Sequence, residues 1–325
     1  MKLRTKVFGL PVVVFLSVLI ILVSISGAGD YPDRAIDLIV TASPGGAVDT
    51  FFRLIQGPLA KELKVQLNII NRPGIAGTSF AANAKGDGYS IVAQDLMSFL
   101  MRQITENTPY DVMKDFAPIA NCAYEPLVLV ARPDLGCNTL KDLIAYAKKN
   151  PGKLLAGITV GGQNYVNLHI LKRAADVEIR YLPLGGGGEI LIQLLGGHVD
   201  FTFSARKAVS AHVRANKLRA LAVLSTERLP EFAGAPTVKE EGFPEVNQNM
   251  NYCLLGPKGL SAEIIEKLSY TVKTVLTSPE VVANLDRNGY LVAFQSPSQL
   301  RERMATDFSQ CYDLAKREGL IKKQK

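Results

Sequence analysis

The sequence is poor in the residues that carry most enzyme chemistry. Among its 325 residues are three histidines and no tryptophan. It contains no H-E-x-x-H zinc motif, no G-x-S-x-G nucleophile elbow and no G-x-x-x-x-G-K-[ST] phosphate loop. The glycine run 185–188 fails the dinucleotide fingerprint, because Ile190 stands where a third glycine would be. We therefore predict no catalytic residue, no metal site and no cofactor, and we interpret His169, His198 and His212 as packed or surface side chains.

Cysteine is also scarce, and its spacing excludes a metal or redox pair. The four cysteines lie far apart, and none belongs to a C-x-x-C motif. An exported chain could form disulfides, and Cys122 with Cys253 is the first pair to test. Four cysteines allow three complete pairings, and four free buried thiols are a further alternative. The two remaining cysteines are Cys137 and Cys311.

Clustered positive charge is absent from most of the chain. The formal charge is +7, and removing the three positive charges of residues 1–28 lowers it to +4. The remaining charges are scattered, apart from Lys322, Lys323 and Lys325 near the C-terminus. This distribution argues against a nucleic-acid partner and indicates only a weak preference for anions.

The N-terminus has the pattern of a targeting segment. Three basic residues precede an apolar run from 7 to 25, and small residues follow at 26–28. This pattern predicts a secretory signal peptide over residues 1–28. An uncleaved membrane anchor is the alternative, because the run approaches the length that spans a bilayer.

The stretch from Ile39 to Arg53 passes from an apolar strand through a Pro-Gly-Gly turn into an amphipathic helix. Its apolar residues recur at helical spacing, and we expect Gly57 and Pro58 to loosen or end the helix. The first turn of such a helix presents unpaired N–H groups and the positive end of the helix dipole. It can therefore hold an oxyanion without a cationic side chain. The alternative is that the glycines only form a tight turn.

Strand, turn and helix alternate twice more before residue 105. A second small-residue turn, with Thr78 as the expected helix cap, follows Asn71, and a third strand ends at Asp95. This alternation predicts a parallel sheet whose turns lie along one edge, where ligands bind. Arg72 beside the second turn could clamp a carboxylate or be solvated. Asp49 could hold its own turn or accept a ligand group.

The pattern repeats after residue 126, which predicts a second lobe. Strands there end in turns at 161–164, at 185–188 and after Ser204, and the loop-like segment 227–249 returns the chain to the first lobe. Helices beginning after Ser261, Ser278 and Ser296 should pack on that first lobe. We therefore expect lobe 1 to comprise residues 29–126 and 250–325, and lobe 2 residues 127–249, with two crossings between them.

Several short motifs occur in a specific order along the chain. They are Pro44-Gly45-Gly46-x-x-Asp49, Asn71-Arg72-Pro73-Gly74-x-x-Gly77, Asp87-Gly88-Tyr89, Tyr110-Asp111-x-x-Lys114-Asp115-Phe116 and Leu218-Arg219-Ala220-Leu221-Ala222-Val223. Together they resemble the substrate-binding receptors of tripartite tricarboxylate transporters, also called Bug proteins, over nearly the whole mature chain.

The resemblance implies a fold, a location and a set of partners. The fold is an α/β, two-lobed, type II periplasmic-binding-protein fold, in which each lobe is a mainly parallel sheet flanked by helices. The protein would be a periplasmic monomer without catalytic activity. Its ligand would be a small carboxylate, and its partners membrane permease subunits. A sensor protein as partner and an enzyme on a similar frame are the alternatives.

The resemblance also implies ligand-binding residues in both lobes. The first-lobe residues are Ser43, Pro44, Gly45, Gly46, Asp49, Gly74, Ile75, Ala76, Gly77 and Thr78, with Asp95, Met97 and Ser98 nearby. The second-lobe residues are Gly161, Gln163, Asn164 and Ser204. Leu184-Gly185-Gly186 stands where the family commonly has Tyr-Lys-Gly, which removes a cation and argues against a second ligand carboxylate. Gln163, Asn164 and Ser204 could instead hydrogen-bond a neutral polar group.

Overall fold

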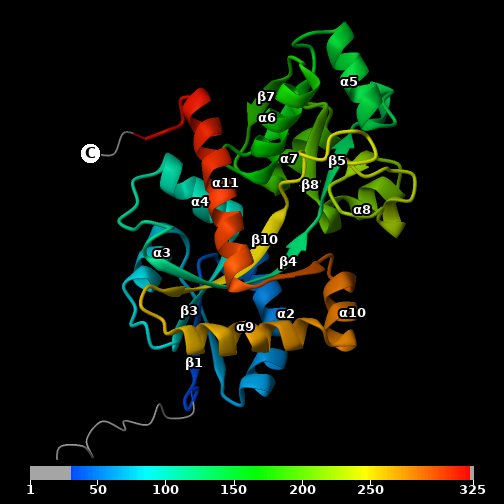
Figure 1. Cartoon of the computed structure of the whole chain (residues 1–325). Helices are drawn as coiled ribbons and strands as arrows, with labels where there is room; N and C mark the ends of the chain where they lie inside the picture. Colours follow the sequence, from blue (N-terminus) through cyan, green and yellow to red (C-terminus); the bar gives the residue numbers. More distant parts are fainter. Residues whose placement is uncertain (1–30, 323–325) are drawn as a thin grey trace, which may run out of the picture.

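The computed structural model describes residues 31–322, so the predicted signal peptide lies outside the described residues. Two β-sheets, one in each half of the molecule, form two lobes joined by strands that cross between them (Figure 1). Within residues 31–322, no helix combines the length and apolarity needed to cross a membrane. The two-lobed α/β class expected from the sequence is confirmed.

Lobe 1 contains a six-stranded sheet in the order β11-β4-β10-β3-β1-β2. Its strands are β1 (Ile36–Val40), β2 (Leu67–Asn71), β3 (Ser90–Asp95), β4 (Phe116–Glu125), β10 (Met250–Pro257) and β11 (Leu291–Gln295). Its helices are α2 (Ala47–Leu63), α3 (Gly74–Ala82), α4 (Leu96–Thr105), α9 (Ala262–Leu276), α10 (Pro279–Arg287) and α11 (Pro297–Arg317).

Lobe 2 contains a five-stranded sheet in the order β7-β6-β8-β5-β9. Its strands are β5 (Leu127–Ala131), β6 (Leu155–Ile158), β7 (Arg180–Pro183), β8 (Phe201–Ala205) and β9 (Arg219–Val223). Its helices are α5 (Leu140–Lys149), α6 (Gln163–Ala175), α7 (Gly187–Leu195) and α8 (Arg206–Arg214), with short 3₁₀ turns at Pro133–Leu135 and Pro230–Phe232.

Both sheets are mixed, which corrects the expectation of mainly parallel sheets. β1 pairs in parallel with β2 and β3, but β10 is antiparallel to both β3 and β4. In lobe 2, β5 is antiparallel to β8 and β9. The strands that carry the chain between the lobes, β4, β5 and β10, are therefore antiparallel to their neighbours, and the edge strands β9 and β11 pair with them in the same way. The parallel units on either side of them keep their turns at one edge of each sheet.

Most predicted helix boundaries are confirmed, with two corrections. Ser261 caps α9, and Ser296 forms a capping box with Gln299 at the start of α11. Pro58 does not end α2, because Leu59 and Leu63 continue the buried face as far as Lys64, which is left-handed with φ 58°. Thr78 does not cap α3 either.

The Thr78 hydroxyl lies inside α3, where it donates to the carbonyl of Gly74. Strands β4 and β11 were not predicted from the sequence. The alternative of four free thiols, rather than a Cys122–Cys253 disulfide, agrees with the structure, in which all four cysteines are buried and free.

One hydrophobic core spans both lobes. It joins Met97 and Met101 of α4 and Leu314 of α11 to Tyr165 and Val166 of α6. Helix α11 begins against the lobe 1 sheet and ends beside lobe 2 (Figure 1). The expectation that the C-terminal helices pack on lobe 1 is therefore incomplete, because α11 packs on both lobes.

Candidate ligand-binding site

Two helices of lobe 1 begin at the tips of neighbouring strands. β1 and β2 are adjacent, with Val40 opposite Asn71, and α2 and α3 start a few residues beyond these ends. The N–H of Gly74 donates to the carbonyl of Thr41 at 3.1 Å and ties the two turns together. The sequence therefore places two helix N-termini side by side, and their dipoles favour a shared anion.

The open donors at these N-termini belong to the helices rather than to the glycines. Among the described residues, no acceptor bonds the N–H groups of Ala47, Val48, Ile75 or Ala76. By contrast, the N–H groups of the two glycines before α2 are already occupied. The open donors are therefore in the first turn of each helix, as expected, and they lie one or two residues after the occupied glycine N–H groups.

The turn before α2 is closed by its own carboxylate. Gly45 donates to Oδ2 of Asp49 at 2.8 Å, and Gly46 donates to the carbonyl of Ser43 at 2.9 Å. Gly45 has φ +76°, a conformation that glycine adopts without strain. The role of this glycine pair is therefore to shape the turn that aims α2.

Asp49 is the buried centre of this turn, with 1% of its surface exposed. Oδ2 also accepts from Nε of Arg53 at 2.8 Å, and Oδ1 accepts from Nδ2 of Asn71 at 2.8 Å. Desolvation raises the pKa of Asp49, but the bonds from Arg53, Asn71 and Gly45 outweigh it and hold this pKa below its ordinary value. Of its two possible uses, the geometry supports the structural one.

The turn before α3 is shaped by Gly77 and lies beside a cation. A Cβ on Gly77 would lie 1.7 Å from the carbonyl oxygen of Arg72, so only glycine fits there. The Arg72 guanidinium stacks over the Phe80 ring at 3.9 Å. Nη1 of Arg102 comes within 3.3 Å of the position of a Cβ on Gly74. Arg102 was missed by sequence reasoning, although its position four residues after Ser98 places both on one face of α4.

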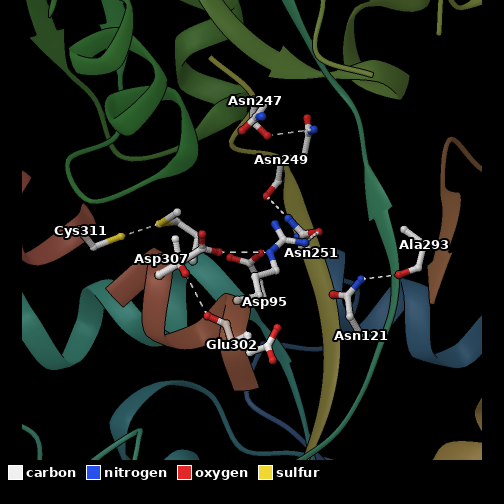
Figure 2. A network of polar contacts seen from close by, with 12 residues as sticks. Asp95, Asn121, Asn247, Asn249, Asn251, Ala293, Glu302, Asp307 and Cys311 are labelled. Atoms are coloured by element: carbon white, nitrogen blue, oxygen red, sulfur yellow. Dashed lines mark hydrogen bonds and ion pairs between the residues drawn. The ribbon is translucent and has the colours of Figure 1, made fainter. Parts of the chain in front are cut away.

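Asp95 connects the lobes beside this site. Its Oδ2 accepts from the N–H of Ser98 at 3.0 Å and from Nε2 of Gln163 in lobe 2 at 2.7 Å. Its Oδ1 accepts from the N–H of Asn251 at 3.1 Å (Figure 2). Burial raises the pKa of Asp95 above its ordinary value. Met97 is buried in the shared core, with its sulfur 3.2 Å from that of Cys311.

The second-lobe residues that the sequence predicted as ligand-binding make different contacts. Oδ1 of Asn164 accepts from the N–H groups of Thr159 and Tyr165, so it holds its own turn. Gly161 has φ +78°, and a Cβ there would lie 3.9 Å from Cε of Met101 in lobe 1. Ser204 is 9% exposed at the end of β8 and makes no side-chain hydrogen bond within residues 31–322.

The polar groups of the site do not form a metal centre. Within residues 31–322, no cluster of three or more His, Cys, Asp or Glu side chains could hold a metal ion. The nearest lobe 2 cation in sequence after Ser204 is Arg206, and it is paired with Glu231 and with Asp286. The site therefore offers backbone N–H groups, amides and hydroxyls, which bind a small anion or polar molecule.

A two-lobed α/β frame, with open helix N-termini at the ends of neighbouring lobe 1 strands, is typical of a solute-binding protein. Residues 51–324 match the model of the tripartite tricarboxylate transporter family receptor. The chain belongs to this family of receptors, as its motifs indicated.

Relatives support the same assignment over nearly the full length. BugT of Bordetella pertussis is 30% identical over 298 residues, which cover 90% of this chain and 91% of BugT. An R. palustris protein solved with adipate is 27% identical with a TM-score of 0.74, covering 90% of this chain and 99% of that one. MatC from Rhodopseudomonas palustris, solved with bound malate, is 26% identical with a TM-score of 0.68, covering 87% of this chain and 99% of that one.

Proposed function

We propose that this receptor captures a small organic carboxylate in the periplasm and delivers it to membrane permease subunits, without chemical turnover. The observation that supports this most directly is the pair of adjacent helix N-termini whose first N–H groups have no acceptor within residues 31–322. Two relatives in the same family were solved with adipate and with malate, both of which are carboxylates.

The carboxylate head group would lie between the starts of α2 and α3. The N–H groups of Ala47, Val48, Ile75 and Ala76 would donate to it directly or through water. The turn residues Ser43 to Gly46, together with Gly77 and Thr78, would position these donors. Arg102 adds a cation beside Gly74. This arrangement recognises one negative group through fixed dipoles rather than through a flexible ion pair.

The rest of the ligand would extend toward lobe 2. Gln163, Asn164 and Ser204 line the ends of β6 and β8, and all three carry hydrogen-bonding groups. The cation that follows Ser204, Arg206, is already neutralised by Glu231 and Asp286. A hydroxyl or amide at the far end of the ligand therefore fits this wall better than a second carboxylate.

A ligand screen by thermal denaturation tests this proposal. Monocarboxylates, dicarboxylates, acidic amino acids and aromatic acids would each be added at a fixed ionic strength. A true ligand at a hundred times its Kd should stabilise the protein by about 2.7 kcal/mol. Stabilisation by none of these acids, or chemical conversion of an acid that binds, would contradict the receptor assignment.

A signalling receptor is the second candidate for the same site. It would bind the same carboxylate but dock on a sensor protein rather than on permease subunits. Co-purification of the ligand-loaded protein with each candidate membrane partner separates the two functions.

A further inference from the structure

A cavity lies away from the proposed carboxylate site. It has a volume of about 780 Å³, which is in the range of small-molecule sites. Its walls come from α6, α11, the start of β10 and the segments 224–226 and 238–249, together with Tyr124 of β4 and Ala293 of β11. No lining residue belongs to β1, β2 or β3 or to the turns that follow them. Because β10 lies between β3 and β4, this hinge-side cavity is across β10 from the two helix N-termini.

Arg303 is a fixed donor in the wall of the hinge-side cavity. Its Nε lies 3.2 Å from Oδ2 of Asp307, and its Nη1 donates to Oδ1 of Asn251 at 2.9 Å. Its Nη2 has no acceptor among residues 31–322. Asn251 and Asp307 face each other in this network (Figure 2). The guanidinium is therefore held on two sides, with one pair of N–H groups left to bind an oxygen.

Gln248 lines the same cavity with a side-chain amide that has no partner among the described residues. Its surface is 7% exposed, and its side chain makes no hydrogen bond within the part of the chain described. Its backbone is held from both sides by Asn167, which accepts from its N–H at 3.0 Å and donates to its carbonyl at 2.7 Å. The Gln248 side-chain amide is therefore free to hydrogen-bond an occupant of the cavity.

The charges around the cavity favour an anion. Four cations, Arg173, Lys239, Arg303 and Arg317, stand against three acidic residues, Glu245, Asp307 and Asp313. Arg303 and Asp307 neutralise each other, and within residues 31–322 the other three cations form no ion pair. We propose that the hinge-side cavity binds a small oxyanion, a carboxylate or a phosphate, and that its occupancy favours the arrangement in which the lobes are in contact.

The coupling follows from the position of the cavity. Its walls come from both lobes, because α11 belongs to lobe 1 and α6 to lobe 2. A rotation about the two crossings that separates the lobes at the carboxylate site brings the opposite walls together. An occupant of the cavity would resist that rotation. An occupant that binds more tightly when the lobes are in contact would therefore raise the affinity of the carboxylate site. This step rests on the proposed function.

The binding test uses inorganic phosphate and citrate as probes, measured by calorimetry at constant ionic strength. The measurement is made in a Gly46→Val background, so that the helix N-termini of lobe 1 do not bind the probe. Arg317→Gln should weaken probe binding roughly tenfold, the effect of losing one charged hydrogen bond. Gln248→Leu should weaken it as well.

Arg301→Gln is the matched control, because Arg301 is an exposed arginine on the same helix that does not line the cavity. It should leave probe affinity unchanged. If neither probe binds, or if all three variants lose the same amount of probe affinity, the proposed anion site is wrong.

The coupling test uses the protein with Gly46 intact and a carboxylate found in the ligand screen. A saturating probe should raise the affinity for that carboxylate several-fold in the parent protein but not in Gln248→Leu. Unchanged or weaker carboxylate binding would overturn the coupling. Because the probe measurement is made where carboxylate binding is blocked, failure of the carboxylate site leaves the cavity test intact.

Discussion

Two glycine turns, one in each lobe, contain the same hydrogen bond from a glycine N–H to a carboxylate, but the two carboxylates differ in burial and in their other partners. Gly45 donates to the carboxylate of Asp49 at 2.8 Å, and Gly185 donates to that of Glu189 at 2.8 Å, so each acid lies four residues after its glycine. Asp49 is buried and bonded to Asn71 and Arg53 as well, whereas Glu189 is exposed.

The lobes also differ in the space around their glycines. A Cβ on Gly46 would lie 3.0 Å from the backbone carbonyl oxygen of Ser43, and one on Gly185 would lie 3.0 Å from the end of the flexible Glu189 side chain. A Cβ on Gly186, Gly187 or Gly188 would meet no atom within 4 Å. The lobe 1 turn is therefore fixed before a ligand arrives, which lowers the entropy lost on binding. The lobe 2 turn has room to change. We interpret the lobe 1 turn as a rigid binding site for the carboxylate head group and the lobe 2 turn as a surface that can adapt to the rest of the ligand.

Removing the two acids should separate the turns most clearly. Asp49→Ala leaves Asn71, Gly45 and Arg53 without their acceptor, and we expect the free energy of unfolding to fall by about 3 kcal/mol. Glu189→Ala, at an exposed site, should change it by less than about 0.5 kcal/mol. Urea unfolding measures both values. Similar losses in the two variants would remove the distinction between the turns.

Adding a side chain at a glycine of each turn tests the same comparison through carboxylate affinity. Gly46→Val forces the lobe 1 turn away from Ser43, and carboxylate affinity should fall by about a hundredfold or more, or 2.7 kcal/mol. Gly186→Ala is the control, because its backbone is extended at φ 167° and its surroundings are open. We expect its affinity, measured by calorimetry, to remain within about threefold of the parent value.

The contact between the lobes should have a smaller effect. Gln163→Leu removes the bond to Asp95, and carboxylate affinity should fall by a factor of about ten because the separated state gains population. Small-angle scattering of the ligand-free variant should show a larger radius of gyration than the parent. An unchanged radius together with unchanged affinity would show that this bond does not hold the lobes.

Lowering the pH should gradually remove the contribution of Asp49 to the free energy of unfolding. Because its folded-state pKa is lowered, its charged form stabilises the fold above the unfolded-state pKa of about 3.9. That stabilisation is lost as the pH falls through the folded-state pKa. The difference in unfolding free energy between the parent and Asp49→Asn should be constant near neutral pH and shrink below about pH 4. If the difference in unfolding free energy grew in acid, the folded-state pKa of Asp49 would be raised rather than lowered, which contradicts the prediction.

The sequence predicted the alternating units because their apolar runs and turn residues are local signals. It did not reveal β4, since Pro118 and Asn121 interrupt its apolar pattern. Pro118 is tolerated because the β4–β10 pairing shifts register opposite Leu255.

The site was predicted only in part for a related reason. Motifs identified the two turns, but which N–H groups are occupied depends on the side chain of Asp49. The Asp95–Gln163 bond and the hinge-side cavity join segments far apart in the chain, and no local pattern encodes such contacts.

Amide chemical shifts measured by NMR during carboxylate titration test the central claim most directly. The account predicts that the N–H groups of Ala47, Val48, Ile75 and Ala76 show the largest changes, because they gain an anionic acceptor. The N–H groups of Gly45 and Gly46, which already have acceptors, should move less. The largest changes at Gln248 and Asn251 instead, with the starts of α2 and α3 unaffected, would contradict it.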